Sequence, residues 1–215
     1  SDSLYELLEK ECGIQRSDCN FELVQVEHHI AHIASSFFTS DWEEAAGISI
    51  DGSGDFVTCM FAECKNNTIT PIHRIYVPNS LGSFYFTGCQ FLGYPYYGDE
   101  GKVMGLAPYG TNTYEDIFNE MIDYKNGQLE LNPKYFKPFG SNQGLEMLPD
   151  GTFKSPIHYT DYFLEQFGSP RAKDGEYEQR FKDFAFGLQN KFEDIFFKLF
   201  NDLYKKIPNK KVVIA

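Results

Sequence analysis

The segment that most constrains the fold is a short apolar strand that runs directly into a glycine-rich turn, Ile48-Ser49-Ile50-Asp51-Gly52-Ser53-Gly54-Asp55. The strand is predicted at residues 45–50, and two further strands follow at residues 56–62 and 68–77. Strands separated by such short turns favour an antiparallel three-strand meander. A helix predicted from His28 onward precedes the meander, and this alternation indicates an α/β fold.

Helical periodicity accounts for much of the remaining chain. The strongest helix prediction covers residues 177–204, where apolar side chains form a continuous stripe. Residues 126–156 are loop-like apart from a short strand at 128–131, and we interpret this segment as an insertion. The other predicted elements are helices at residues 2–12, 80–92 and 112–124, a short helix within 93–110, and strands at 20–26 and 212–215, the last a buried strand of the parallel type.

Composition excludes several classes of protein. The chain is 42% hydrophobic and 17% aromatic, enough for a core, and its net charge of -12 argues against a nucleic-acid partner. No apolar run approaches the roughly 18 residues of a membrane span, so no membrane partner is expected. The five cysteines form no CxxC pair, which argues against a disulfide framework and indicates a reducing, cytoplasmic location.

His28 and His32 form a candidate metal site together with Asp51. The two histidines are four positions apart and therefore share one face of the predicted helix, and Asp51 ends a strand whose side chain can reach a neighbouring helix start. Mixed histidine and carboxylate ligands suit Fe²⁺, our first choice, or Mn²⁺ or Zn²⁺, better than Mg²⁺ or Ca²⁺. The alternative is a helix start that holds one or two satisfied core imidazoles. His73 and His158 stand alone and are interpreted as surface or structural residues.

The turn at Gly52, Ser53 and Gly54 is a candidate phosphate-binding site, because such turns expose backbone N–H groups. A hairpin turn without any ligand explains the same glycines equally well. The acids at both ends of the turn make sense beside a phosphate if a cation lies between them.

The glycine-punctuated segment 98–110 holds two further candidates for nucleotide binding. Glu100 could accept hydrogen bonds from ribose hydroxyls, and Lys102 could meet a phosphate. The alternative is a loop with a short packed helix.

Three motifs occur in one order: His28-His29-Ile30-Ala31-His32 with its following residues, the strand that ends in DGSGD, and the run GDEGKVMGLAPYG at residues 98–110. Together they closely resemble the NodU/CmcH family of O-carbamoyltransferases. The third motif is long and specific, and the resemblance runs from about residue 20 to the end.

The resemblance implies an actin-like ATPase fold with RNase H-like lobes. Residues 1–40 would end the first lobe and residues 41–215 would begin the second, with the insertion at about 126–156. By the same resemblance, His28, His32 and Asp51 match the family's metal ligands, and residues 52–54 match its phosphate-contacting turn. The family's first phosphate turn and its carbamoyl-adenylate-forming domain are not in this sequence, so we expect a fragment that is inactive alone.

The implied reaction transfers a carbamoyl group from carbamoyl-adenylate, made from carbamoyl phosphate and ATP, to a hydroxyl of a sugar or antibiotic-like acceptor. No catalytic base is assigned. The assembly considered is a homodimer. Two alternatives remain: an actin-like sugar kinase or ATPase that uses Mg²⁺, and a non-catalytic nucleotide-binding module.

Overall fold

A computed structural model describes residues 2–96, 98–137, 146–147, 151 and 153–215. Its main sheet has four strands in the order β3-β2-β1-β8. The meander β1–β2–β3 is antiparallel, and β8 adds to β1 in parallel, so the sheet is mixed. The four strands are β1 (Glu44–Gly54), β2 (Val57–Lys65), β3 (Thr68–Tyr76) and β8 (Val212–Ile214).

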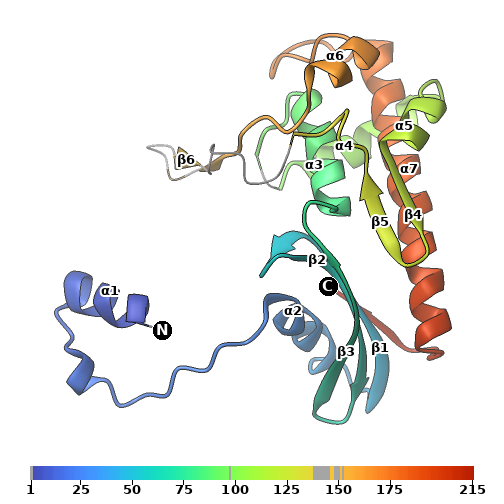
Figure 1. Ribbon diagram of the computed structural model, residues 1–215. Coiled ribbons are helices and arrows are strands. Elements are labelled where there is room, and N and C mark those ends of the chain that lie inside the picture. Colours follow the sequence, from blue (N-terminus) through green and yellow to red (C-terminus); the bar gives the residue numbers. More distant parts are fainter. Residues whose placement is uncertain (1, 97, 138–145, 148–150, 152) are drawn as a thin grey trace.

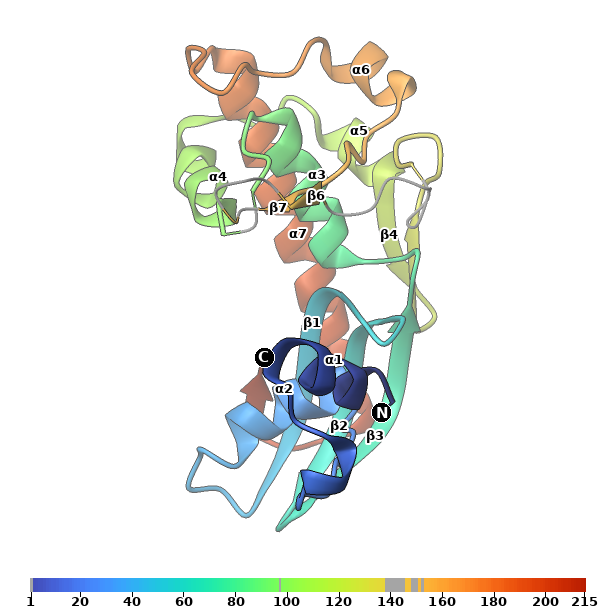
Figure 2. The same cartoon turned by 90° about the vertical axis from the view of Figure 1, so that its left-hand side faces the viewer.

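Helices cover both faces of this sheet, as Figures 1 and 2 show. Helix α2 (His28–Phe37) packs Ile33 and Phe37 on one face, against residues such as Met60 and Ala62 of β2. Side chains of β2 that point to the opposite face of the sheet, such as Phe61, belong to the second and larger core, which the other helices cover. Both faces of β2 are thus buried, which explains why its sequence is almost continuously apolar rather than alternating.

The helices that follow β3 in the chain pack around α7 (Gln179–Lys206), a 28-residue helix that extends from the helical part of the molecule alongside the sheet (Figure 1). Its apolar stripe is buried as predicted, and rings such as Phe91, Phe163 and Phe184 meet in one aromatic cluster. The other helices are α3 (Leu81–Phe91), α4 (Glu100–Leu106), the 3-10 turn η2 (Ala107–Tyr109), α5 (Glu115–Met121) and α6 (Asp161–Phe167).

The turn between β1 and β2 differs from the prediction. Strand β1 continues through the glycine-rich segment, with a register shift between Ile50 and Gly54 that leaves residues 51–53 as a bulge. The hairpin turn itself is formed by Asp55 and Phe56, which both have positive φ. This is the two-residue turn type that matches strand twist, so the hairpin interpretation was right in kind and displaced in position.

The predicted strand at residues 20–26 is wrong. These residues belong to an extended connection between η1 (Arg16–Asp18) and α2, and helix α1 (Asp2–Cys12) stands apart from the sheet (Figure 1). Val24 and Val26 are exposed by 70% and 58%. An alternating sequence forms a strand only when another strand pairs with it, and within the described residues none does.

Two further predictions need correction. The helix predicted at residues 112–124 is shorter, because Ile122–Lys125 forms strand β4 and pairs with β5 (Gln128–Leu131), the strand that was predicted. The last strand is parallel as expected, but only Val213 is buried, since β8 lies at the sheet edge.

Much of the predicted insertion lies outside the described residues. Its described part includes the short strands β6 (Glu146–Met147) and β7 (Phe153–Lys154), which pair with each other. Among the helices that the structure describes, none combines the length and the apolar character that crossing a bilayer requires.

Candidate metal centre

The side chains of His28, His32 and Asp51, here called the triad, converge at one point. His28 Nε2 lies 2.7 Å from Asp51 Oδ2 and 2.9 Å from His32 Nε2, and His32 Nε2 lies 3.4 Å from the same carboxylate oxygen. All three side chains are half-buried, with exposures of 39%, 42% and 39%. The predicted convergence of the three residues is therefore present in the structure.

The start of α2 fixes both histidines. The Asp55 carboxylate accepts a hydrogen bond from the His28 backbone N–H at 2.8 Å, which satisfies one free donor of the first helical turn. Glu27, directly before the helix, forms two hydrogen bonds with the guanidinium of Arg74 on β3. Since His32 follows His28 by one turn, these contacts set the position of both rings.

The β1 bulge and the start of α3 fix Asp51. Its Oδ1 atom accepts the Gly52 N–H at 2.6 Å, which leaves Oδ2 directed at the histidines. Ser80 Oγ donates to the Asp51 carbonyl at 3.1 Å and also accepts the Ser83 N–H as the N-cap of α3. A Cβ on Gly82 would lie 2.8 Å from the Gly52 nitrogen, so only glycine allows α3 to approach the bulge this closely.

The carboxylate of Asp51 is kept ionised by these contacts. Partial burial raises the pKa of Asp51, but the hydrogen bonds from His28 and the Gly52 N–H, with the charges of His28 and His32, outweigh burial. The pKa therefore lies below its ordinary value, and the group carries its negative charge at neutral pH.

The middle histidine, His29, has a structural role. It is fully buried, with Nδ1 2.8 Å from Ser49 Oγ and Nε2 2.9 Å from the Val57 carbonyl. The carbonyl can only accept, so Nε2 carries the proton and the hydroxyl donates to Nδ1. The satisfied core imidazole considered from the sequence is therefore His29, while His28 and His32 point to Asp51.

The donor atoms of the triad fit a divalent cation. Ligands about 2.1 Å from an ion lie about 3.0–3.4 Å apart in octahedral or tetrahedral geometry. The three separations of 2.7, 2.9 and 3.4 Å are close to this range. Three lone-pair-bearing atoms this close repel one another unless a proton or a cation lies between them, and imidazole with carboxylate is a donor set typical of transition metals.

A cavity of about 600 Å³, here called the site cavity, opens beside the triad. Asp51 forms part of its wall, and of the predicted nucleotide-binding residues Gly52, Ser53 and Glu100 also line it. Its size is that of a small-molecule site. The remaining lining residues are Ile50, Gly82, Ser83, Tyr85, Phe86, Met104, His158, Gln189 and Phe192.

Gly54 and Lys102 are not among the described residues that line the site cavity. The Lys102 ammonium lies 2.6 Å from Asp99 Oδ1 and over the Tyr94 ring, so its charge is already paired. Glu100 accepts the Gly98 N–H at 2.8 Å through one of its two oxygens. In the bulge, the Gly52 N–H donates to Asp51 Oδ1 at 2.6 Å.

Sequence reasoning did not find Ser80, Gly82 or the cavity position of His158. The helix predicted at residues 80–92 already places Ser80 at the start of α3, where serine is a typical N-cap, but the sequence gives no signal that the same hydroxyl reaches Asp51. His158 was interpreted as a lone structural residue, yet it lines the site cavity, and its Nε2 lies 3.0 Å from Ser155 Oγ.

The fold and the triad define a mixed α/β protein with a histidine–carboxylate cluster of the metal-binding type beside a small-molecule cavity. Residues 3–215 match the carbamoyltransferase N-terminus family. The chain belongs to this family, which agrees with the resemblance stated from its motifs.

Several curated proteins are similar to this chain. An uncharacterized protein of Synechocystis sp. is 34% identical over 192 residues, which cover 88% of this chain and 29% of the relative. The nodulation protein NolNO of Sinorhizobium fredii is 29% identical over 173 residues, 80% of this chain and 22% of the relative. The nodulation protein NolO of Bradyrhizobium diazoefficiens is 36% identical over 99 residues, 46% of this chain and 18% of that protein. The chain thus spans less than a third of the length of these relatives.

Proposed function

We propose that this chain is part of an O-carbamoyltransferase whose triad holds a divalent cation, Fe²⁺ in the first place, with Mn²⁺ or Zn²⁺ as alternatives. The observation that carries the proposal is the convergence of His28, His32 and Asp51 within a family of carbamoyltransferases. The donor would be carbamoyl-adenylate, formed from carbamoyl phosphate and ATP. The acceptor would be a hydroxyl of a small sugar or antibiotic-like molecule.

In the proposed reaction, the acceptor oxygen attacks the carbamoyl carbon and forms a new C–O bond. The bond between that carbon and the phosphate oxygen breaks, AMP leaves, and the hydroxyl proton passes to water. A bound cation would act as a Lewis acid beside the adenylate phosphate.

The chain's own groups would position the substrates of this reaction. Asp51 and the two imidazoles would bind the cation, and the Ser53 segment of the bulge would face the phosphate. The second carboxylate oxygen of Glu100 would accept hydrogen bonds from the ribose hydroxyls. The apolar walls Phe86 and Phe192 exclude water, which would otherwise compete with the acceptor.

We also propose that the chain has an actin-like fold with RNase H-like lobes. The mixed sheet with helices on both faces supports an actin-like, RNase H-like arrangement, in which residues 1–40 end one lobe and residues 41–215 begin the next. We also retain a cytoplasmic location and a homodimer as parts of the proposal.

Metal binding is the first test of the proposed function. The protein is loaded anaerobically with Fe²⁺, or with Mn²⁺, and the bound metal is measured after desalting. His28→Ala and His32→Ala are expected to lose the metal, while His73→Ala, away from the triad, keeps it. Tight binding of Mg²⁺ with no preference for transition metals would favour the kinase or ATPase alternative.

Carbamoyl transfer is the second test, and it requires the longer protein in which this chain occurs. That protein is incubated with carbamoyl phosphate, ATP and hydroxyl acceptors, and carbamate esters are detected by mass spectrometry. Binding of ATP without any ester product would favour the non-catalytic alternative.

A further inference from the structure

A second cavity, here called the apolar cavity, adjoins the site cavity. Its volume is about 340 Å³, within the range of small-molecule sites. Ser83 and His158 line both cavities, so the two share a wall. The other lining residues are Val77, Pro78, Thr87, Leu131, Pro133, Phe136 and Lys137.

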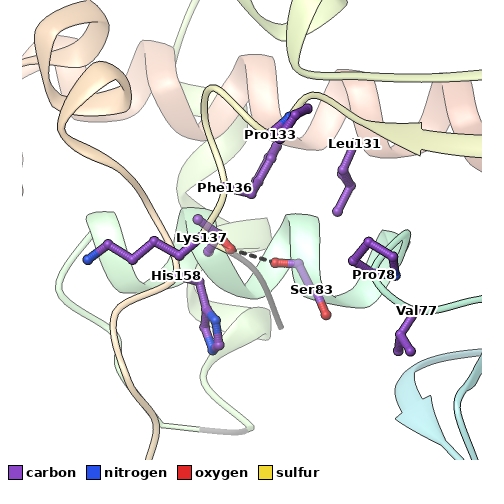
Figure 3. A pocket seen from close by; sticks show the side chains of 9 residues that line it. Val77, Pro78, Ser83, Leu131, Pro133, Phe136, Lys137 and His158 are labelled. Atoms are coloured by element: carbon purple, nitrogen blue, oxygen red, sulfur yellow. Dashed lines mark hydrogen bonds between the residues drawn. The ribbon is translucent and has the colours of Figure 1, made fainter. Parts of the chain in front are cut away.

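Among the described residues, the walls of the apolar cavity are mostly hydrocarbon and carry no carboxylate. Figure 3 shows the Lys137 side chain running away from the other lining residues, with its ammonium at the far end. Burial lowers the pKa of His158, so its imidazole is neutral at physiological pH. Thr87 Oγ1 already donates to the Ser83 carbonyl at 2.8 Å, the dashed line in Figure 3.

The Ser83 hydroxyl is the feature of this cavity that indicates a ligand. Ser83 is 5% exposed, and its Oγ finds no hydrogen-bond partner among the residues that the structure describes. Figure 3 places this side chain between His158 and the Val77–Pro78 side of the cavity. A buried hydroxyl without a partner is unfavourable, and a ligand that offers a hydroxyl or carbonyl would satisfy it.

The cavity wall near His158 is held in place before any ligand arrives. Gln90 on α3 accepts the His158 N–H at 3.0 Å and donates to the Pro156 carbonyl at 2.8 Å. The Lys137 N–H donates to the His158 carbonyl at 2.7 Å. Such a fixed wall reduces the entropy lost on binding.

We propose that the apolar cavity holds the uncharged, largely apolar part of the hydroxyl acceptor and that Ser83 hydrogen-bonds to it. This inference rests on the proposed function, because the acceptor must reach the site cavity through the shared wall. It predicts an acceptor with a ring or acyl portion next to its hydroxyls, and it disfavours polycationic aminosugars, because the described residues that line this cavity include no carboxylate.

The test uses three probes: phenyl β-D-glucopyranoside, D-glucose, which lacks the apolar part, and the 2-amino-2-deoxy analogue of the phenyl glucoside, which adds a cation. Binding is measured by ligand-observed NMR. We expect the phenyl glucoside to bind, and the other two to bind at least about tenfold more weakly. Equal binding of the aminosugar, or no binding of the phenyl glucoside, would overturn the inference.

Variants locate the probe. Pro133→Trp should fill the cavity and weaken phenyl glucoside binding about tenfold or more, whereas Pro170→Trp, an exposed proline outside both cavities, should not. Ser83→Ala removes only the hydroxyl and should weaken binding about fivefold to tenfold, with the exposed Ser17→Ala as its control. Thermal melting monitored by circular dichroism checks that each variant is folded. Phenyl glucoside affinity that Pro133→Trp leaves unchanged would contradict the inference.

The outcome is separable from that of the proposed function. If the metal test fails while the phenyl glucoside still binds in a Pro133-dependent way, the transferase assignment falls and the cavity remains a binding site. If the metal test succeeds and the probe binds elsewhere, only the acceptor assignment falls.

Discussion

The His28 ring lies directly against the backbone of Gly54. A Cβ on Gly54 would be 2.1 Å from both Cδ2 and Cγ of His28, far closer than two carbon atoms can approach. The last glycine of the DGSGD run is therefore required by the neighbouring histidine rather than by the hairpin turn, which begins one residue later. A motif interpreted from sequence as a phosphate turn thus sets the position of a ring of the triad.

Gly54→Ala should displace the His28 ring and weaken metal binding about tenfold to a hundredfold, the usual effect of disturbing the residues that orient a ligand. Metal affinity is measured by competition with a chromogenic chelator. Gly52→Ala is the matched control, because a Cβ there meets nothing within 4 Å. Equal affinities for the two variants would show that the position of the His28 ring does not matter.

The glycine that ends the GDEGKVMGLAPYG run also has a packing role. A Cβ on Gly110 would lie 2.0 Å from the Lys182 carbonyl oxygen in the backbone of α7. The next residue, Thr111, is held to the same helix through its N–H, which donates to Asp183 Oδ1 at 2.8 Å.

Gly110→Ala should therefore lower the free energy of unfolding by about 1–3 kcal/mol or more, because a backbone atom of a long helix cannot move aside. Gly105→Ala in the same motif should be neutral or stabilising by up to about 1 kcal/mol, since a Cβ there has open space and alanine favours helix. Urea unfolding of both variants gives the comparison, and equal losses of stability would contradict the packing argument.

The sequence predicts best those elements whose cause is local. The stripe of α7 repeats over 28 residues, and the strands of the meander are joined by short turns, so both are recognisable without the rest of the fold. Residues 20–26 carry a strand pattern but lack a partner strand among the described residues. Helix α6 is absent from the sequence predictions because it is short and Thr160 is its one clear start signal.

The same distinction applies to the site. His28 and His32 share a helix face by spacing alone, and Asp51 could be added because it ends a strand. The contacts that orient Asp51 come from Ser80 and Gly82, about thirty residues later, and depend on how α3 meets β1. Asp99 and Lys102 are three positions apart in the same motif, yet the sequence does not show that their side chains form an ion pair.

The Glu27–Arg74 ion pair should make stability depend on pH in the acidic range. The hydrogen bonds from Arg74, opposed by slight burial and assisted by the charge of Arg74, hold the pKa of Glu27 below its ordinary value. When the pKa of a carboxyl group is lower in the folded state than in the unfolded state, the ionised group stabilises the protein at pH values above the unfolded-state pKa. This stabilisation is lost as the pH falls through the folded-state pKa.

Glu27→Gln should thus lower the free energy of unfolding by about 1 kcal/mol at neutral pH, and the difference from the unsubstituted protein should shrink between about pH 5 and pH 3. Guanidinium unfolding at several pH values measures it, with the exposed Glu22→Gln as control. A difference that stays constant down to pH 3 would mean that the ion pair does not contribute.

The buried imidazole of His29 should give a second pH dependence, of the same sign but nearer neutrality. Burial lowers the pKa of His29 despite its hydrogen bond to Val57, so the folded state keeps the ring neutral while the unfolded chain takes up a proton below about pH 6.5. Stability should therefore fall as the pH drops from about 7 to 5.

At pH 8, His29→Asn should lower the free energy of unfolding by about 1–3 kcal/mol, because Ser49 and the Val57 carbonyl lose a buried partner. That cost should shrink on acidification, measured by urea unfolding with chelator present; a cost that grows toward pH 5 would mean that folded His29 is charged.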